Sequence, residues 1–282
     1  MTIASAGREA QDPHLTTFSL LLAGIAIGVA FMAINVAFPG LAPTGIPTIL
    51  IRVALHVLIL SGLWLGLART DFSPARRLAI WLAFVVPFTL WLAIVWPLAL
   101  NGAFEPGLAG IPRLPIAILG PVIVGAPLLM FSRSVGALLD AMPASWLIAL
   151  QVYRVFGGVF LLGWINGLVP GVFALPAGTG DMLTGLAALS VAGAVASGSA
   201  SGRRAAMMWN LFGLADLTVA ITMGALSSPG PLQIFNIGGP ASPIGSYPTV
   251  MIPAFAVPSS ILLHVLSIRQ LMRRRERASL SA

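Results

Sequence analysis

Three ionisable residues, Arg154, Asp181 and Asp216, fall inside stretches of sequence that are otherwise apolar enough to cross a membrane. At a rise of about 1.5 Å per helical residue, each lies roughly 13 to 18 Å from one end of its stretch. His56 falls at a similar level in another apolar stretch. Charges are costly at this depth and normally face the interior of a bundle, where they pair. We therefore predict that these four residues meet near the middle of the bilayer.

The charges of this group do not cancel. Arg154 can hold one aspartate through a fork of two hydrogen bonds, which leaves the second aspartate without a fixed cation. That carboxyl group must hold a proton, pair with a protonated His56, or bind a cation or the positive group of a ligand. Alternatively, a buried arginine–aspartate pair simply locks helices together. We favour a functional cavity because several ionisable residues share one level.

Further polar residues accompany the charged ones. Gln151 precedes Arg154 by three positions, and Asn210 precedes Asp216 by six, so each pair shares one helical strip. Counted along the same rise, Gln151, Asn210 and His264 lie about 9 Å from the inner face. They would line an inner vestibule or form hydrogen bonds between helices.

The residues just before Asp181 predict an interrupted helix. Proline removes a backbone donor, and glycine permits a close approach of the backbone; Pro176, Gly178 and Gly180 combine the two within five positions. Broken helices in transporters expose half-helix ends that bind ions or substrate groups. We predict a helix break at these residues. The alternative is a proline kink with glycines that serve helix packing.

Composition sets the fold class. Of the 282 residues, 58% are apolar and 8% are charged, whereas a soluble domain carries roughly 25% charged residues. Eight apolar runs approach the roughly 20 residues that a spanning helix needs, and they lack the alternation of a barrel strand. We predict an all-α polytopic bundle of about eight spans. The runs cover residues 16–38, 48–68, 78–100, 114–131, 145–168, 171–196, 205–226 and 248–270.

The arginines orient this bundle. Most of them flank alternate loops, whereas Arg113 alone falls in the loops on the other side, and the cytoplasmic side is the arginine-rich one. We predict that both termini are cytoplasmic. The chain then divides into a flexible cytoplasmic N-terminus (1–15), a transmembrane helical domain (16–271) and a basic cytoplasmic tail (272–282). A short helix over 133–142 would lie in the interface, with Asp140 exposed.

Several kinds of chemistry are excluded or not favoured. The chain has no cysteine, so it forms no disulfide and no thiolate site. All fifteen basic residues are arginine, which excludes a lysine Schiff base. The net charge of +7 belongs to arginines beside the spans, so we predict no nucleic-acid partner. We predict no metal site and no cofactor; haem ligation by His56 and His264 has no other supporting signal.

The second half of the chain carries a set of short motifs. They are Gln151-x-Tyr153-Arg154, Gly180-Asp181-x-Leu183-x-Gly185-Leu186, Trp209-Asn210-x-Phe212-Gly213, Phe255-x-Val257-Pro258 and His264-x-x-Ser267-x-Arg269-Gln270-Leu271. Through these motifs, residues 150–271 resemble a family of uncharacterised bacterial multi-pass inner-membrane proteins. The resemblance implies a bacterial inner membrane and a shared architecture, but no reaction. Asp216 and His56 are not part of the pattern.

We expect a carrier or binding protein for a small molecule or ion, with proton coupling through Asp181 or Asp216. A first alternative is a membrane-embedded enzyme that acts on a lipid or hydrophobic small molecule, with Asp181 or His264 as the acid or base. A second is a non-catalytic structural or assembly subunit. The sequence leaves the oligomeric state open.

Overall fold

The computed structural model describes residues 46–105, 113–230, 232–235 and 243–280, and separate positions between 22 and 38. The predicted N-terminal segment (1–15) lies outside these residues, as does most of the predicted first span (16–38). Within the described part the chain forms helices and no strands, and seven helical segments are long and apolar enough to cross a membrane. The all-α polytopic fold is thereby confirmed, and each apolar run predicted between residues 48 and 270 corresponds to one of these segments.

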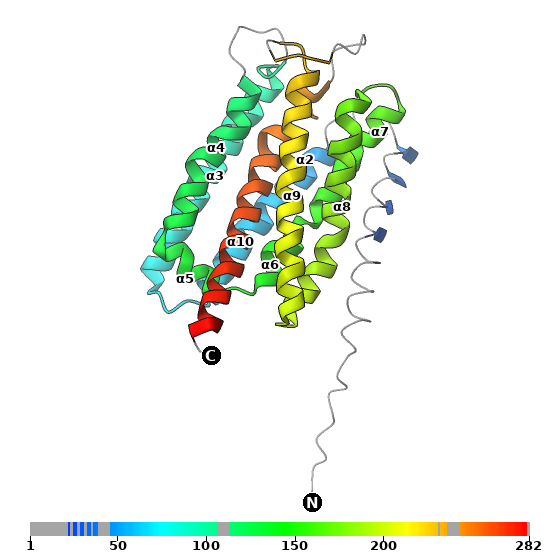
Figure 1. Ribbon diagram of the computed structural model, residues 1–282. Coiled ribbons are helices and arrows are strands. Elements are labelled where there is room, and N and C mark those ends of the chain that lie inside the picture. The colour runs from blue at the N-terminus through cyan, green and yellow to red at the C-terminus, as the bar shows by residue number, and fades with distance from the viewer. Residues whose placement is uncertain are drawn as a thin grey trace, which may run out of the picture.

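Figure 1 shows the order of the helical elements along the chain. They are α2 (Ile46–Leu67), α3 (Pro74–Leu100), α4 (Arg113–Phe131), α5 (Arg133–Ala141), α6 (Ala144–Leu150), the 3₁₀-helix η2 (Gln151–Gly158), α7 (Val159–Ile165), α8 (Gly171–Ala196), α9 (Ala200–Ser227), the 3₁₀-helix η3 (Pro243–Gly245), the π-helix η4 (Ile252–Ala256) and α10 (Val257–Leu280).

The interruption lies in the fifth predicted span, not the sixth. There the chain passes from α6 through the eight-residue η2 into α7, and η2 is longer than the 3 to 4 residues usual for a 3₁₀ run. By contrast, α8 continues without a break through Pro176, so the predicted helix break is wrong. A proline removes one backbone hydrogen bond, and membrane helices tolerate that loss where neighbouring elements compensate.

The glycines of α8 serve packing instead. A Cβ atom on Gly178 would stand 2.8 Å from the side chain of Leu161, on α7. One on Gly180 would overlap the carboxylate of Asp216, on α9. Both glycines therefore let neighbouring elements come close to α8, as the alternative interpretation of this stretch required.

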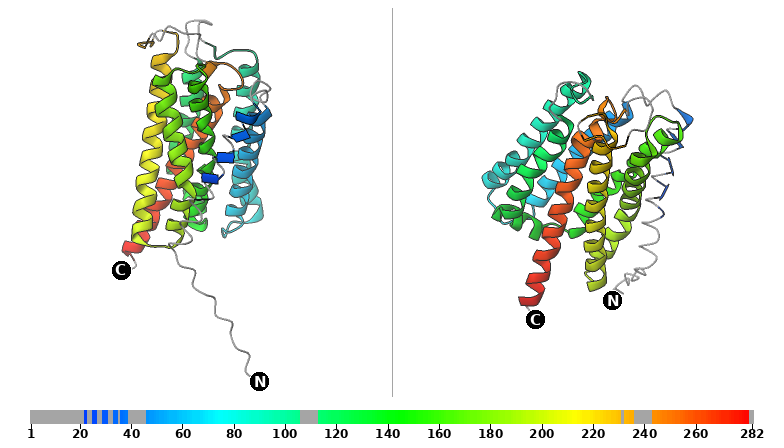
Figure 2. Two further views of the ribbon diagram at one scale, coloured as in Figure 1. Left: turned by 90° about the vertical axis from the view of Figure 1, so that its right-hand side faces the viewer. Right: turned by 45° about the horizontal axis from the view of Figure 1, so that its top comes forward.

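Two helices organise the bundle. The most extensive packing joins α8 to α9, η2 and α6, while α10 contacts α4, α9, α6 and α5 and so lies between the two sides of the bundle (Figure 1). Ile123 and Leu128 on α4 are both more than 60% exposed, at 67% and 66%. Apolar side chains this open to the surroundings are expected where lipid covers a protein. Figure 2 shows the same arrangement from two further sides.

The short helix predicted over 133–142 is present as α5, but Asp140 is not exposed. Its carboxylate accepts from Arg273 Nε at 3.0 Å, and Gln270 Nε2 donates to the carbonyls of Leu139 and Met142 at 2.6 and 2.8 Å. Side chains of α10 thus satisfy carbonyls that the end of α5 leaves open. The predicted basic tail continues α10 as a helix as far as Leu280.

Candidate functional site

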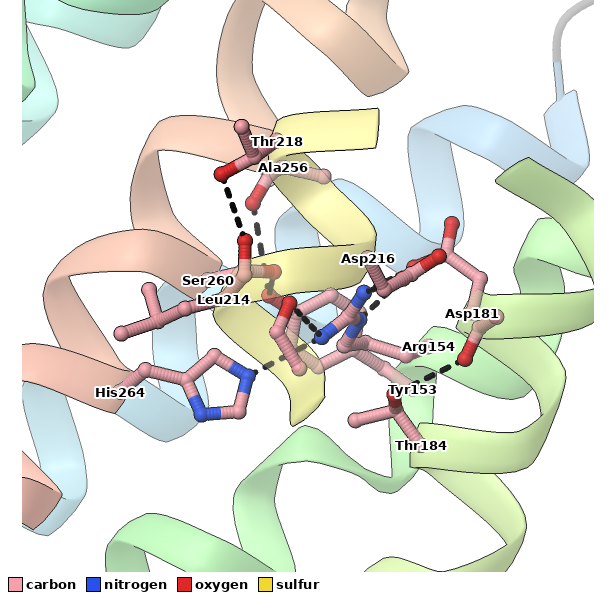
Figure 3. A network of polar contacts seen from close by, with 12 residues as sticks. Tyr153, Arg154, Asp181, Thr184, Leu214, Asp216, Thr218, Ala256, Ser260 and His264 are labelled. Atoms are coloured by element: carbon pink, nitrogen blue, oxygen red, sulfur yellow. Dashed lines mark hydrogen bonds and ion pairs between the residues drawn. The ribbon is translucent and has the colours of Figure 1, made fainter. Parts of the chain in front are cut away.

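Arg154 is the centre of a buried polar network that connects four helical elements (Figure 3). Its side chain extends from η2 and the residue is only 3% exposed. Arg154 Nε donates to Asp181 Oδ1, on α8, at 2.7 Å, and Nη2 lies 2.7 Å from the same oxygen. Nη2 also donates to Asp216 Oδ2, on α9. The structure therefore brings together the three charged residues that the sequence placed in the middle of the membrane.

The remaining donors of Arg154 reach α9 and α10. Nη1 donates to the carbonyl of Gly213 at 3.3 Å and to His264 Nε2, on α10, at 3.0 Å. A guanidinium can only donate, so His264 Nε2 must accept and the ring is neutral with its proton on Nδ1. That proton is donated to Asn210 Oδ1 at 2.9 Å. The network therefore includes His264 and Asn210, and all three guanidinium nitrogens have partners.

Two glycines make room for these side chains. A Cβ atom on Gly213 would stand 2.3 Å from His264 Nε2 and 3.0 Å from Arg154 Nη1. A Cβ atom on Gly180 would stand 1.7 Å from Asp216 Oδ1. Any larger residue at either position would displace a member of the network. The site therefore requires both glycines.

The two remaining predicted site residues lie outside this network. His56 Nε2 is 3.0 Å from Thr89 Oγ1, and the His56 ring stacks on Phe88 with centroids 4.8 Å apart. A matching depth does not fix the direction in which a helix presents a side chain, and α2 presents His56 to α3. Gln151, on η2, is fully buried, and neither of its amide atoms has a hydrogen-bond partner among the described residues.

A cavity of about 130 Å³ adjoins the network. Its wall includes Arg154 and Asp181, the hydroxyl residues Tyr153 and Ser260, and apolar side chains from α2, α9 and the start of the last span. The side chain of Asp181 keeps 13% of its surface exposed, against 5% for Asp216. Asp181 is therefore the carboxylate that a cavity ligand can reach, and Asp216 lies behind it.

Arg52, from α2, also lines this cavity and was not among the predicted site residues. It is 4% exposed, and its guanidinium carbon lies 4.5 Å from the ring centre of Trp96. Nη2 donates to Tyr247 Oη at 3.4 Å, but Nε and Nη1 have no partner among the described residues. Arg52 lies six residues after the start of α2, where an arginine can extend its side chain to the membrane interface, so its sequence position only weakly indicates a site.

In the part of the chain that the structure describes, no three His, Asp or Glu residues gather as they would around a metal ion. The groups that the site holds, a guanidinium, two carboxylates and an imidazole, are suited to hydrogen bonding, ion pairing and proton exchange.

A model of one protein family, described as a domain of unknown function (DUF8737), matches residues 111–272, which is more than half of the chain. The chain belongs to this family. No curated protein and no solved structure matches it.

The DUF8737 region holds every member of the Arg154 network, Asp216 included. The resemblance noted over residues 150–271 lies within it, and the family region extends further towards the N-terminus. Arg52 precedes the region, so the cavity is built jointly by the family region and by α2.

Proposed function

We propose that this protein is a membrane carrier or binding protein for a small molecule or ion, with its ligand site in the cavity beside Arg154 and Asp181. The observation that carries the proposal is that the cavity reaches a buried network of charges. A lock between helices needs no space next to it, whereas a ligand site does. The volume of the cavity, about 130 Å³, exceeds the roughly 10–15 Å³ that one water molecule needs.

The charge of the network supports proton coupling. One guanidinium faces two carboxylates, so the three groups together carry one negative charge unless a carboxyl group is protonated. Of the two, Asp181 is the one on the cavity wall and hence the one that can exchange a proton with the cavity. The interrupted fifth span supports the proposal as well, because 3₁₀ stretches within longer helices often mark functional hinges.

The structural alternative also has an observation in its favour. Arg154 is almost fully buried and each of its nitrogens is hydrogen bonded, as a lock between η2, α8, α9 and α10 would require. The enzyme alternative has less support. His264 is fully buried, and both ring nitrogens are engaged with Arg154 and Asn210, so a lipid substrate would not meet it.

The membrane and orientation are part of the proposal. We place the protein in a bacterial cytoplasmic membrane with both termini inside, because the arginine-rich loops should remain on the cytoplasmic side.

Cysteine labelling tests the proposal without knowledge of the ligand, since the chain has no native cysteine. Ala256 lines the cavity, whereas Ala254, two residues earlier in η4, is fully buried outside it. Ala256→Cys should react with a small membrane-impermeant methanethiosulfonate, and the matched control Ala254→Cys should not. The reaction is measured by mass spectrometry in right-side-out and inside-out vesicles.

The outcomes separate the candidate functions. Reaction of Ala256→Cys from both sides supports a carrier, because alternating access exposes one residue to each side in turn. Reaction from one side supports a binding protein. If Ala256→Cys stays unreactive from both sides while the protein is folded, the cavity is closed to solutes and the structural alternative replaces this proposal.

A further inference from the structure

We propose that the ligand of this cavity is a small organic anion, and that Arg52 binds its carboxylate while the apolar body lies against the cavity wall. The inference rests on the proposed function, because it names the class of ligand for the same cavity.

Arg52 is a buried cation that has no anionic partner among the residues that the structure describes. It is more than nine-tenths buried, lines the cavity, and has no hydrogen-bond partner at Nε or Nη1 among the described residues. Those two nitrogens carry three of the five N–H donors of a guanidinium. Buried charges are ordinarily paired or hydrogen bonded, because leaving water without compensation is costly. Three free donors on a cavity wall therefore indicate an anionic occupant.

No acidic residue in the described part of the chain supplies that anion. All acidic residues except Glu9 and Asp12 lie in the described part of the sequence, and the three ion pairs found there do not include Arg52. The other charged residues on the cavity wall, Arg154 and Asp181, are paired with each other. Among the described residues of the wall, Arg52 is thus the charged group whose donors are left open.

Aromatic contacts hold the guanidinium in place. Trp96 stacks on it at 4.5 Å, and Tyr247 offers its ring at 5.7 Å as well as its hydroxyl at 3.4 Å. These contacts fix the plane of Arg52 but do not use its Nε and Nη1 donors. A fixed guanidinium plane with free donors matches a carboxylate, which accepts hydrogen bonds in the same plane.

The rest of the wall favours an apolar body on the anion. Leu55, Leu217, Met251 and Val257 line the cavity, and its volume of about 130 Å³ suits a ligand of a few carbon atoms. An inorganic anion would gain nothing from these side chains, whereas an aliphatic tail would bury apolar surface against them. One guanidinium pairs with one carboxylate, so a monocarboxylate needs no cation besides Arg52.

The test uses Ala256→Cys, which lies on the same cavity, and asks which solutes protect it from the methanethiosulfonate. The probes are butyrate, the neutral butyramide, the cationic butylammonium and chloride, applied to the purified full-length protein. Butyrate should slow the labelling in a saturable way, and the other three should not at equal concentration. Protection by butyramide or butylammonium would overturn the role of the negative charge, and equal protection by chloride would overturn that of the apolar body.

Arg52→Gln in the Ala256→Cys background tests the residue itself. The half-protecting concentration of butyrate should rise at least about tenfold, as expected for the loss of hydrogen bonds to a charged group. The matched control is Arg69→Gln, since Arg69 also stacks on a tryptophan, Trp146, at 4.7 Å but is exposed. It should leave protection unchanged.

Each proposal fails in its own way. An unreactive Ala256→Cys contradicts the proposed function, whereas a reactive cysteine that butyrate does not protect contradicts only the carboxylate ligand. Protection that survives Arg52→Gln would remove Arg52 from the site. If Arg52→Gln does not fold, Arg52→Lys serves in its place: it keeps the charge but loses the planar set of donors, so it should weaken protection.

Discussion

A single arginine, Arg154, links the buried charged residues of this bundle. Arg154 joins four helical elements and serves two carboxylates, a histidine and a backbone carbonyl. When one member of a buried ion pair is removed, the charge of its partner stays buried without compensation. The protein is then destabilised by about 3–5 kcal/mol. The two aspartates differ in their access to the cavity. Asp181 faces the cavity, and without its charge Arg154 would still have Asp216.

At the residue scale we therefore expect Asp181→Asn and Arg154→Ala to differ. Arg154→Ala leaves two facing carboxylates without a cation and should lower the free energy of unfolding by about 3–5 kcal/mol. Asp181→Asn leaves Arg154 balanced by Asp216, so the protein should fold and yet be inactive. Thermal unfolding in detergent measures the first effect. Labelling of Ala256→Cys from only one membrane side, in the Asp181→Asn background, would show the second.

The opposite result has a clear meaning. If Asp181→Asn fails to assemble and Arg154→Ala fails to the same degree, the pair holds the helices together and the site is architectural. Asp216→Asn is a useful comparison. It removes one carboxylate charge from the same network, but at a residue that lies behind Asp181 and does not line the cavity.

At the scale of elements, the interrupted fifth span depends on close contact with α8. A Cβ atom on Gly185 would stand 2.4 Å from the backbone nitrogen of Val155, which belongs to η2. This contact places Arg154, the neighbour of Val155, directly beside α8. The last span shows a second local adjustment. Pro258 cannot donate to the helix, and the carbonyl of Ala254, one turn earlier, accepts from Trp91 Nε1 at 3.2 Å.

We expect Gly185→Ala to destabilise the protein by about 1–3 kcal/mol, as overpacking commonly does. The clash is with backbone, so no side-chain rotation relieves it and η2 must move away from α8. Thermal unfolding gives the size of the effect. The control is Gly120→Ala on α4, where a Cβ atom would meet nothing within 4 Å. Equal stability of the two variants would mean that η2 does not rest on α8 in this way.

For the whole molecule, the arginine distribution and the helical bundle together predict the topology. The turn between α8 and α9 precedes Arg203 and Arg204, whereas the segment after α9 has no arginine before residue 269. One of these connections precedes α9 and the other comes after it. They therefore lie on opposite sides of a membrane that α9 crosses. The positive-inside rule assigns the first to the cytoplasm.

The topology can be checked with two exposed positions, Ser201 and Gln233. An impermeant thiol reagent should label Gln233→Cys in intact cells, and it should label Ser201→Cys only after the membrane is permeabilised. The two variants act as controls for each other. The reverse pattern would invert the orientation, and labelling of both in intact cells would show that α9 does not cross the membrane.

The amino-acid sequence by itself determined the fold class and most of the spans, because long apolar runs with few charges have one stable solution in lipid. It also determined that Arg154, Asp181 and Asp216 would lie deep, since depth follows from the count of residues along a helix. The direction of each side chain around its helix was decided only in the tertiary structure. That is why His56 faces Thr89 and not the aspartates, and why Arg52 turned inwards to the cavity.

The location of the interruption was likewise a tertiary outcome. Pro176 and the glycines of α8 predicted a break from local preference, yet α8 is continuous because its glycines are used for contact with α7 and α9. The residues of the fifth span indicate a helix break less strongly, yet this span forms a 3₁₀-helix where it meets Gly185. Local propensity is a small energy beside the packing of a bundle, so contact between helices, and not the residue types of one helix, decided where the chain departs from α-helix.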